Sequence, residues 1–195
     1  MQRTVSVLAI SAWMLAGHIG YGQSTASNPT VLVREVHFVG ESGGTQRELR
    51  ECTEFLVGHR MEKNAVLKES TSAVAAFLHR RGFLKARVSP EIRPARTFGS
   101  AKEEAVALEI TIEAGNRYRI KDLTFAGLSR QVDDAELRRT CNLRNGEVAD
   151  GGEAGNCVSN LIALFHQKGL DVTVIPSMTF DEERSTVVFG FDIEK

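Results

Sequence analysis

Cysteine and histidine are the residue types in this sequence best suited to chemistry, and it holds three and five of them. Cys141 ends one expected helix and Cys157 begins the next, so an antiparallel helix pair would bring the two together. A disulfide there would stabilise the fold by about 3 kcal/mol. It would leave Cys52, on the apolar stripe of another expected helix, unpaired. The alternative is that all three cysteines are reduced and buried.

His79 and His166 occupy equivalent positions near the ends of two similar helices. A metal site needs further ligands at fixed spacing, and the sequence places none nearby. Because a helix C-terminus favours a cation, we expect a surface or capping role for both side chains. The sequence therefore predicts no metal site and no cofactor.

Residues 150–156 are rich in glycine but lack the lysine and the serine or threonine of a phosphate-binding loop. Their two acidic side chains would repel phosphate, so we expect a turn between helices. No zinc-protease pair, nucleophile elbow or Cys-x-x-Cys motif occurs in the sequence. We therefore expect no catalytic residues and a protein that is not an enzyme.

Composition and charge describe an ordinary globular protein, with 42% hydrophobic and 25% charged residues. The formal net charge of −1 gives no electrostatic reason to expect nucleic acid as a partner. No segment after residue 22 is apolar enough to span a bilayer. Any association with a membrane is therefore expected to run through partners.

Residues 1–22 have the three parts of a secretory signal peptide. Arg3 supplies the charge, an apolar stretch of about a dozen residues follows, and small residues precede Gln23. We expect this segment to be removed, residues 23–30 to form a tether, and the mature protein to lie outside the cytoplasm, where disulfides form. The alternative is that residues 1–22 remain as an anchor.

The rest of the chain contains the same unit twice. The matching pairs of segments are 34–40 with 121–127, 77–83 with 164–170, and 106–112 with 187–193. The first copy is longer because of a polar loop around residues 93–104. We therefore predict two domains, 31–115 and 116–195, and the short link at residues 113–117 predicts a semi-rigid rod.

Each unit is predicted to have the order β-α-α-β-β, from alternating strand patterns and helical apolar stripes. Gly82 and Gly169 suit the ends of helices, and Asp134 suits a helix N-cap. The expected buried helix positions are Leu49, Cys52, Leu56, Leu67, Val74, Leu78, Leu137, Cys141, Val158, Leu161, Ile162 and Phe165. The predicted fold class is α+β, each unit a three-stranded mixed sheet covered on one face by two helices.

This order of elements resembles the polypeptide-transport-associated (POTRA) domain family. Residues 36–40, residues 77–83 and the junction at residues 113–127 carry the resemblance, which extends over residues 31–195. His79 and His166 depart from it, because the family often has tyrosine there. POTRA domains usually precede an outer-membrane β-barrel, whereas here we expect two tandem repeats without one.

The resemblance implies an exported, polypeptide-binding module that assists outer-membrane protein assembly or secretion. Its expected place is the periplasm, at or near the outer membrane, and its expected partners are polypeptide clients or an outer-membrane β-barrel protein. Two alternatives stay open. One is an envelope scaffold of the cell-division (FtsQ-like) kind, which an uncleaved anchor would favour, and the other is a secreted enzyme with an unrecognised site.

The free edge of each sheet could pair with an extended peptide by β-augmentation. The second strand of each unit is the candidate edge, and its candidate residues are Leu84, Ala86, Arg87, Val88, Val172 and Val174. The alternative for the first unit is that Lys85 and Arg87 keep the edge unpaired. The two valines leave the second edge less protected, so it is slightly favoured.

Overall fold

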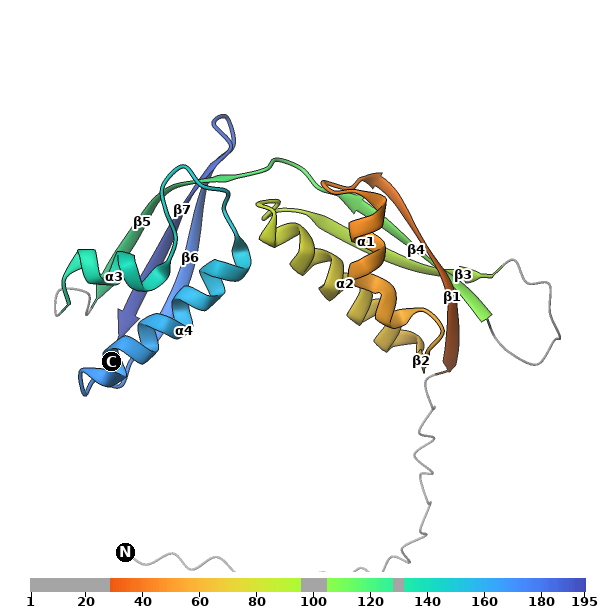
Figure 1. The fold of residues 1–195 in the computed structure, drawn as a ribbon, viewed down its shortest axis with the longest axis horizontal. Coiled ribbons are helices and arrows are strands. Elements are labelled where there is room, and N and C mark those ends of the chain that lie inside the picture. The colour runs from red at the N-terminus through yellow and green to blue at the C-terminus, as the bar shows by residue number, and fades with distance from the viewer. Residues whose placement is uncertain (1–28, 96–104, 128–131) are drawn as a thin grey trace, which may run out of the picture.

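The computed structural model describes residues 29–95, 105–127 and 132–195. They form two α+β units that lie end to end (Figure 1), each with a hydrophobic core of its own. The predicted signal peptide lies outside the described residues, as do nearly all of the predicted tether and most of the polar loop. Within the described part of the chain, no helix combines the length and the apolar character needed to cross a bilayer.

The first unit has seven elements: β1 (Thr30–Glu41), α1 (Gln46–Thr53), the 3-10 helix η1 (Glu54–Leu56), β2 (Arg60–Glu62), α2 (Lys63–Arg80), β3 (Arg87–Pro94) and β4 (Ala105–Glu113). Its sheet has the order β2-β1-β4-β3, in which only β1 and β4 are parallel. The short β2 is a fourth strand where three are predicted. It forms because Gly58, with a φ of 80°, donates its N–H to the Val33 carbonyl at 2.9 Å and directs the chain along β1.

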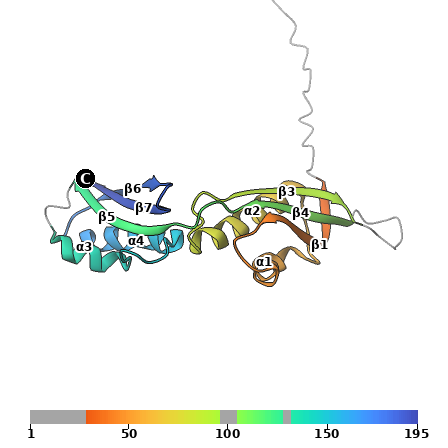
Figure 2. The same ribbon diagram turned by 90° about the horizontal axis from the view of Figure 1, so that it is seen from above.

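The second unit has five elements: β5 (Arg119–Gly127), α3 (Asp134–Cys141), α4 (Gly151–Gln167), β6 (Thr173–Asp181) and β7 (Thr186–Glu194). Its sheet has the order β5-β7-β6, with β5 and β7 parallel and β6 antiparallel to β7. Both helices of each unit lie on the same face of its sheet (Figure 2). The predicted fold class, two tandem β-α-α-β-β units, is confirmed.

The first strand of each unit has a bulge at the same position of the repeat. The register slips at Arg34 in β1 and at Lys121 in β5. Alternation alone would place residues three apart on opposite faces of a strand. Because of the extra residue, Ile120 and Leu123 are both buried in the second core.

The buried stripe of each long helix is narrower than predicted. In α2 it recurs every fourth residue, through Val66, Ser70, Val74 and Leu78, so Leu67 is only partly buried. In α4 the buried residues are Cys157, Leu161 and Phe165, whereas Ile162 is 40% exposed. The prediction was wrong at Ile162 because one further residue rotates a side chain by about 100°, past the contact with the sheet.

Two helix starts also differ from the prediction. Asp133, not Asp134, caps α3 and accepts a hydrogen bond from the Ala135 N–H at 3.4 Å. The Asp150 carboxylate accepts hydrogen bonds from the Gly152 and Glu153 N–H groups at 2.7 and 3.1 Å, and α4 begins directly after Asp150. Residues 151–156 are therefore helix rather than the expected turn, because the side-chain cap satisfies N–H groups that would otherwise lack partners.

Candidate functional site

Both predicted second strands lie at sheet edges, but not all of the predicted edge residues do. Arg87 and Val88 belong to β3, whereas Leu84 and Ala86 lie in the turn before it. In the second unit Val174 lies in β6 with its side chain buried, and Val172 precedes the strand. The strands start later than predicted because the chain needs several residues to reverse direction after each helix.

Prolines block part of the β3 edge. Ala95, directly after β3, donates its N–H to the Ala105 carbonyl at 3.2 Å. By alternation, the backbone N–H and C=O groups of the odd-numbered residues of β3 point to β4, and those of the even-numbered residues point outward. Two of the four outward positions are Pro90 and Pro94, which have no N–H to donate. Exposed charged side chains such as Arg87 and Glu91 add to this protection.

The β6 edge is more open. Its one proline, Pro176, is tolerated because its nitrogen faces away from β7. By the same alternation, Val174, Met178 and Phe180 direct their N–H groups outward. Ile175 and Met178 are 46% and 51% exposed as whole residues, so this edge carries apolar surface and few charges.

An apolar hollow of about 250 Å³ lies directly beside this edge. Its lining residues are His79, Leu84, Gly151, Ala154, Gly155, Val158, Pro176, Ser177, Met178, Phe189 and Phe191. The small residues of α4 keep the space open; a Cβ on Gly155, for example, would meet no atom within 4 Å. A second hollow, of about 490 Å³ between β1 and α1, is lined mainly by arginine and glutamate side chains. The first hollow is the one suited to burying an apolar side chain.

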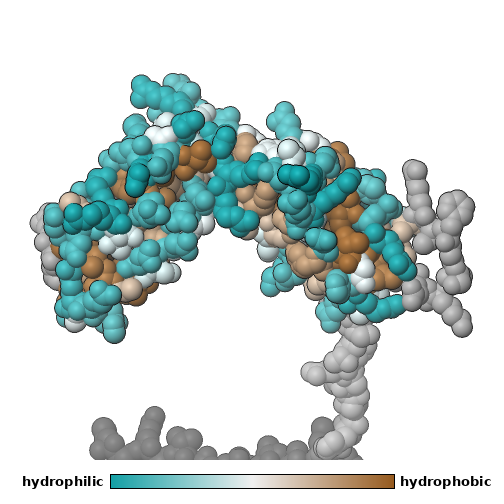
Figure 3. Space-filling model, in the orientation of Figure 1, coloured by the Kyte–Doolittle hydropathy of each residue, from teal (hydrophilic) through white to brown (hydrophobic). Residues whose placement is uncertain are grey.

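Apolar surface is otherwise limited on the face of the molecule in Figure 3. Hydrophilic residues cover most of it, and small apolar patches are visible on both units. Scattered apolar side chains are normal on a protein surface and carry no function by themselves. The hollow beside β6 differs because it lies next to unpaired backbone groups.

The turn that follows α2 joins the first unit to the second. Tyr118 donates its N–H to the Gly82 carbonyl at 2.8 Å, and the Arg117 side chain donates to the Arg81 carbonyl at 2.9 Å. Gly82 has a φ of 88°, and a Cβ there would lie 2.9 Å from the backbone carbonyl oxygen of Tyr118. Only glycine fits this close approach.

Glu182, in the turn after β6, receives contacts from both units. Its carboxylate pairs with the Lys85 ammonium and accepts a hydrogen bond from the Tyr118 hydroxyl. The Lys85 ammonium also lies 4.4 Å from the centre of the Phe180 ring, which meets the Tyr118 ring edge-on at 4.9 Å. The Lys85 and Tyr118 hydrogen bonds hold the pKa of Glu182 below its usual value. Burial and the carboxylate raise the pKa of Tyr118 to about 12.

His79 and His166 have different surroundings. His166 is exposed, as predicted for a surface residue. His79 lines the hollow close to the start of α4, and burial lowers its pKa below the usual value. Its imidazole is therefore neutral near pH 7. Among the described residues no group of three or more metal-ligating side chains occurs.

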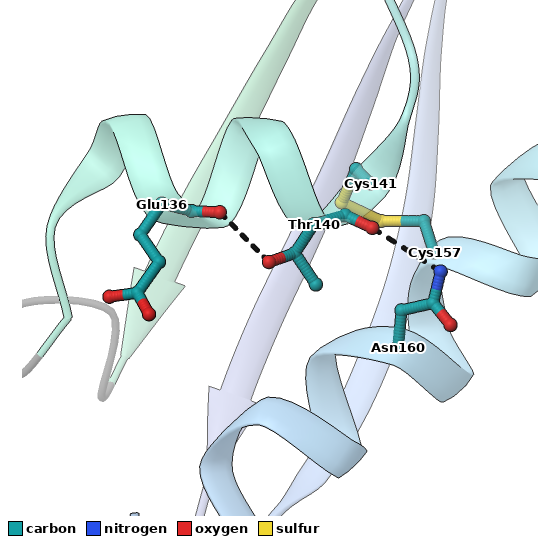
Figure 4. The surroundings of a disulfide bond; sticks show 5 residues. All are labelled: Glu136, Thr140, Cys141, Cys157 and Asn160. Carbon is teal, nitrogen blue, oxygen red and sulfur yellow. Dashed lines mark hydrogen bonds between the residues drawn. A yellow bond between two sulfur atoms is a disulfide. The ribbon is translucent and has the colours of Figure 1, made fainter.

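Cys141 and Cys157 form a disulfide that joins the end of α3 to α4 (Figure 4). Their Cα atoms are 4.2 Å apart. One turn further along α4, Asn160 donates to the Thr140 carbonyl at 3.3 Å, so two links hold the helix pair together. Cys52 is free and half-buried, and burial raises the pKa of its thiol.

Comparison with known proteins identifies the class of domain. Residues 31–115 match the family model of the POTRA domain, described as a surface antigen variable number repeat. The fold is similar to POTRA domains 3–5 of BamA from Haemophilus influenzae, with a TM-score of 0.65 and 18% identity over 85% of this chain and 61% of that chain. No curated protein matches the sequence.

A second similar structure is BamA from Haemophilus ducreyi lacking POTRA domains 1–3, with a TM-score of 0.65 and 18% identity over 86% of this chain and 29% of that chain. This chain therefore spans less than two thirds of either BamA structure. The resemblance to the POTRA family is confirmed, by the family model over the first unit and by the fold over both.

Proposed function

We propose that this chain is an exported, non-enzymatic polypeptide-binding module that assists outer-membrane protein assembly or secretion. It acts in the periplasm, after removal of residues 1–22. Its partners are polypeptide clients or an outer-membrane β-barrel protein. The similarity to POTRA domains of BamA supports this role at the level of the family and the fold.

The β6 edge is the working surface in this proposal. An extended segment pairs with the outward N–H and C=O groups of β6, which is β-augmentation. Side chains of an added strand alternate between its two faces, so every second one points towards the helices and the hollow. The observation that carries the proposal is this combination of an open edge with an apolar hollow beside it. Backbone pairing tolerates many client sequences, as an assembly factor requires.

A proline at Met178 tests the pairing directly. Met178→Pro removes an outward N–H and keeps the bonds to β7, whereas Met178→Leu keeps the N–H. The loss of one backbone hydrogen bond is expected to weaken binding about fivefold. The measurement is in-cell photo-crosslinking from Ile175 on β6, in both backgrounds, with adducts identified by mass spectrometry.

Ile162 provides a matched control position, because it is an exposed apolar residue of the same unit on the outer side of α4. The proposal predicts barrel proteins or their precursors among the Ile175 adducts, reduced by Met178→Pro and absent from Ile162. Equal yields in both backgrounds would contradict strand pairing. Division or inner-membrane proteins among the adducts would instead indicate the envelope scaffold.

A further inference from the structure

The hollow beside β6 is a composite of the two units. His79 and Leu84 come from the first unit, and the rest of the lining comes from the second. Leu84 packs against the core of the second unit although it belongs to the turn that leads into β3. Neither unit alone therefore encloses the space next to the peptide-binding edge.

One side chain links the end of β6 to the part of the hollow that the first unit supplies. Glu182 follows the last residue of β6, and Lys85 follows Leu84 directly. The pair thus joins the end of the edge strand to the residue that closes the hollow. The buried Tyr118 hydroxyl donates to the same carboxylate, and its backbone N–H is bound to the same turn through Gly82.

The link is suited to setting position rather than to supplying unfolding stability. The side chains of Lys85 and Glu182 are 47% and 53% exposed, and ion pairs this exposed add little to the stability of a fold. The angle between two units joined by a short link is a softer degree of freedom. A small preference for one arrangement then changes the fraction of molecules in which the hollow is complete, and with it the apparent affinity.

We infer that Glu182 is a positioning residue of the peptide site, which holds Leu84 and His79 of the first unit against the β6 edge. The inference rests on the proposed function. The peptide contacts the edge and the hollow, and Glu182 acts on it only through the placement of the first unit. Capture of a client is thereby coupled to the arrangement of the two units.

A charge-reversal cycle tests this inference. Glu182→Lys and Lys85→Glu each place like charges opposite one another, and the double variant restores an attractive pair. Glu183→Lys is the matched control, because it makes the same charge change in the same turn. Two quantities are measured in the full chain: the distance between spin labels at the exposed positions Lys68 and Ala163, and the adduct yield from Ile175.

Each single variant is expected to broaden the distance distribution and to lower the adduct yield about three- to fivefold. The double variant restores both quantities, and Glu183→Lys changes neither. A loss of adducts without a change in distance overturns the inference, as does a change in distance that leaves the adducts intact. Absence of Ile175 adducts from the unmodified chain overturns the peptide site itself, and the inference with it.

Discussion

At the scale of single residues, two glycines at equivalent positions of the repeat perform different tasks. Gly82 and Gly169 both follow a long helix and both have positive φ, 88° and 76°. A Cβ at Gly82 would lie 2.8 Å from Val148 and 2.9 Å from the Tyr118 oxygen, whereas at Gly169 it would meet nothing within 4 Å. The first glycine therefore serves the contact between units as well as the turn.

The pair allows backbone strain to be separated from the contact. The positive φ alone should make Gly82→Ala and Gly169→Ala each destabilise the protein by about 1 kcal/mol, because alanine disfavours this backbone conformation. Gly82→Ala should cost more, since its Cβ also displaces the second unit. Urea unfolding of both variants measures the difference. Equal losses of unfolding free energy would mean that the contact between the units adjusts to the extra Cβ at no cost.

At the scale of elements, the helix starts depend on side chains that precede the helical pattern. Asp133 caps α3, and the next residue, Asp134, instead pairs with Arg138 at 2.7 Å. An N-cap side chain satisfies an N–H group that has no partner within the helix. An exposed ion pair one turn apart contributes much less.

The two aspartates should therefore differ in their effect on stability. Asp133→Ala is expected to lower the free energy of unfolding by about 1 kcal/mol. Asp134→Ala should lower it by about 0.3 kcal/mol, the usual scale of an i, i+4 pair. Thermal denaturation of both variants decides, and a larger loss for Asp134→Ala would place the cap at that residue.

At the scale of the whole molecule, acid should loosen the joint between the units. The pKa of Glu182 lies below its usual value because its charged form is bound by Lys85 and Tyr118. The carboxylate therefore favours the arrangement in which Glu182 contacts Lys85 of the first unit, and this contribution is complete at pH values above the usual pKa of 4.5. It is lost as the pH falls through the lowered pKa of Glu182. Tyr118, with a pKa of about 12, stays protonated throughout.

Label distances between Lys68 and Ala163, recorded from pH 7 downwards, check this expectation. They should broaden in the acid range in the unmodified chain, while Glu182→Gln should already show a broad distribution at pH 7. His79 also faces the joint and gains charge below its lowered pKa. Its response persists in Glu182→Gln, so the difference between the two proteins isolates the carboxylate. Identical pH profiles would assign the change to His79.

The sequence alone predicts the repeat, the order of the main elements in each unit and the choice of β3 and β6 as edge strands. These follow from alternation, helical stripes and turn glycines, which are properties of neighbouring residues. The sequence also offers a disulfide between Cys141 and Cys157 as one of two alternatives, because it predicts both at helix ends across a short turn. The structure has the disulfide, with Cys157 inside α4 rather than at its start.

The way in which the two units complete the site becomes visible only in the folded chain. Several features leave no periodic signal in the sequence: the short β2, the bulges at Arg34 and Lys121, and the contact of Leu84 with the second unit. Glu182 has none either, since its role depends on Lys85 and Tyr118, which are distant from it in sequence. Such features arise from packing between segments far apart in the chain, and a local pattern records only what neighbours do.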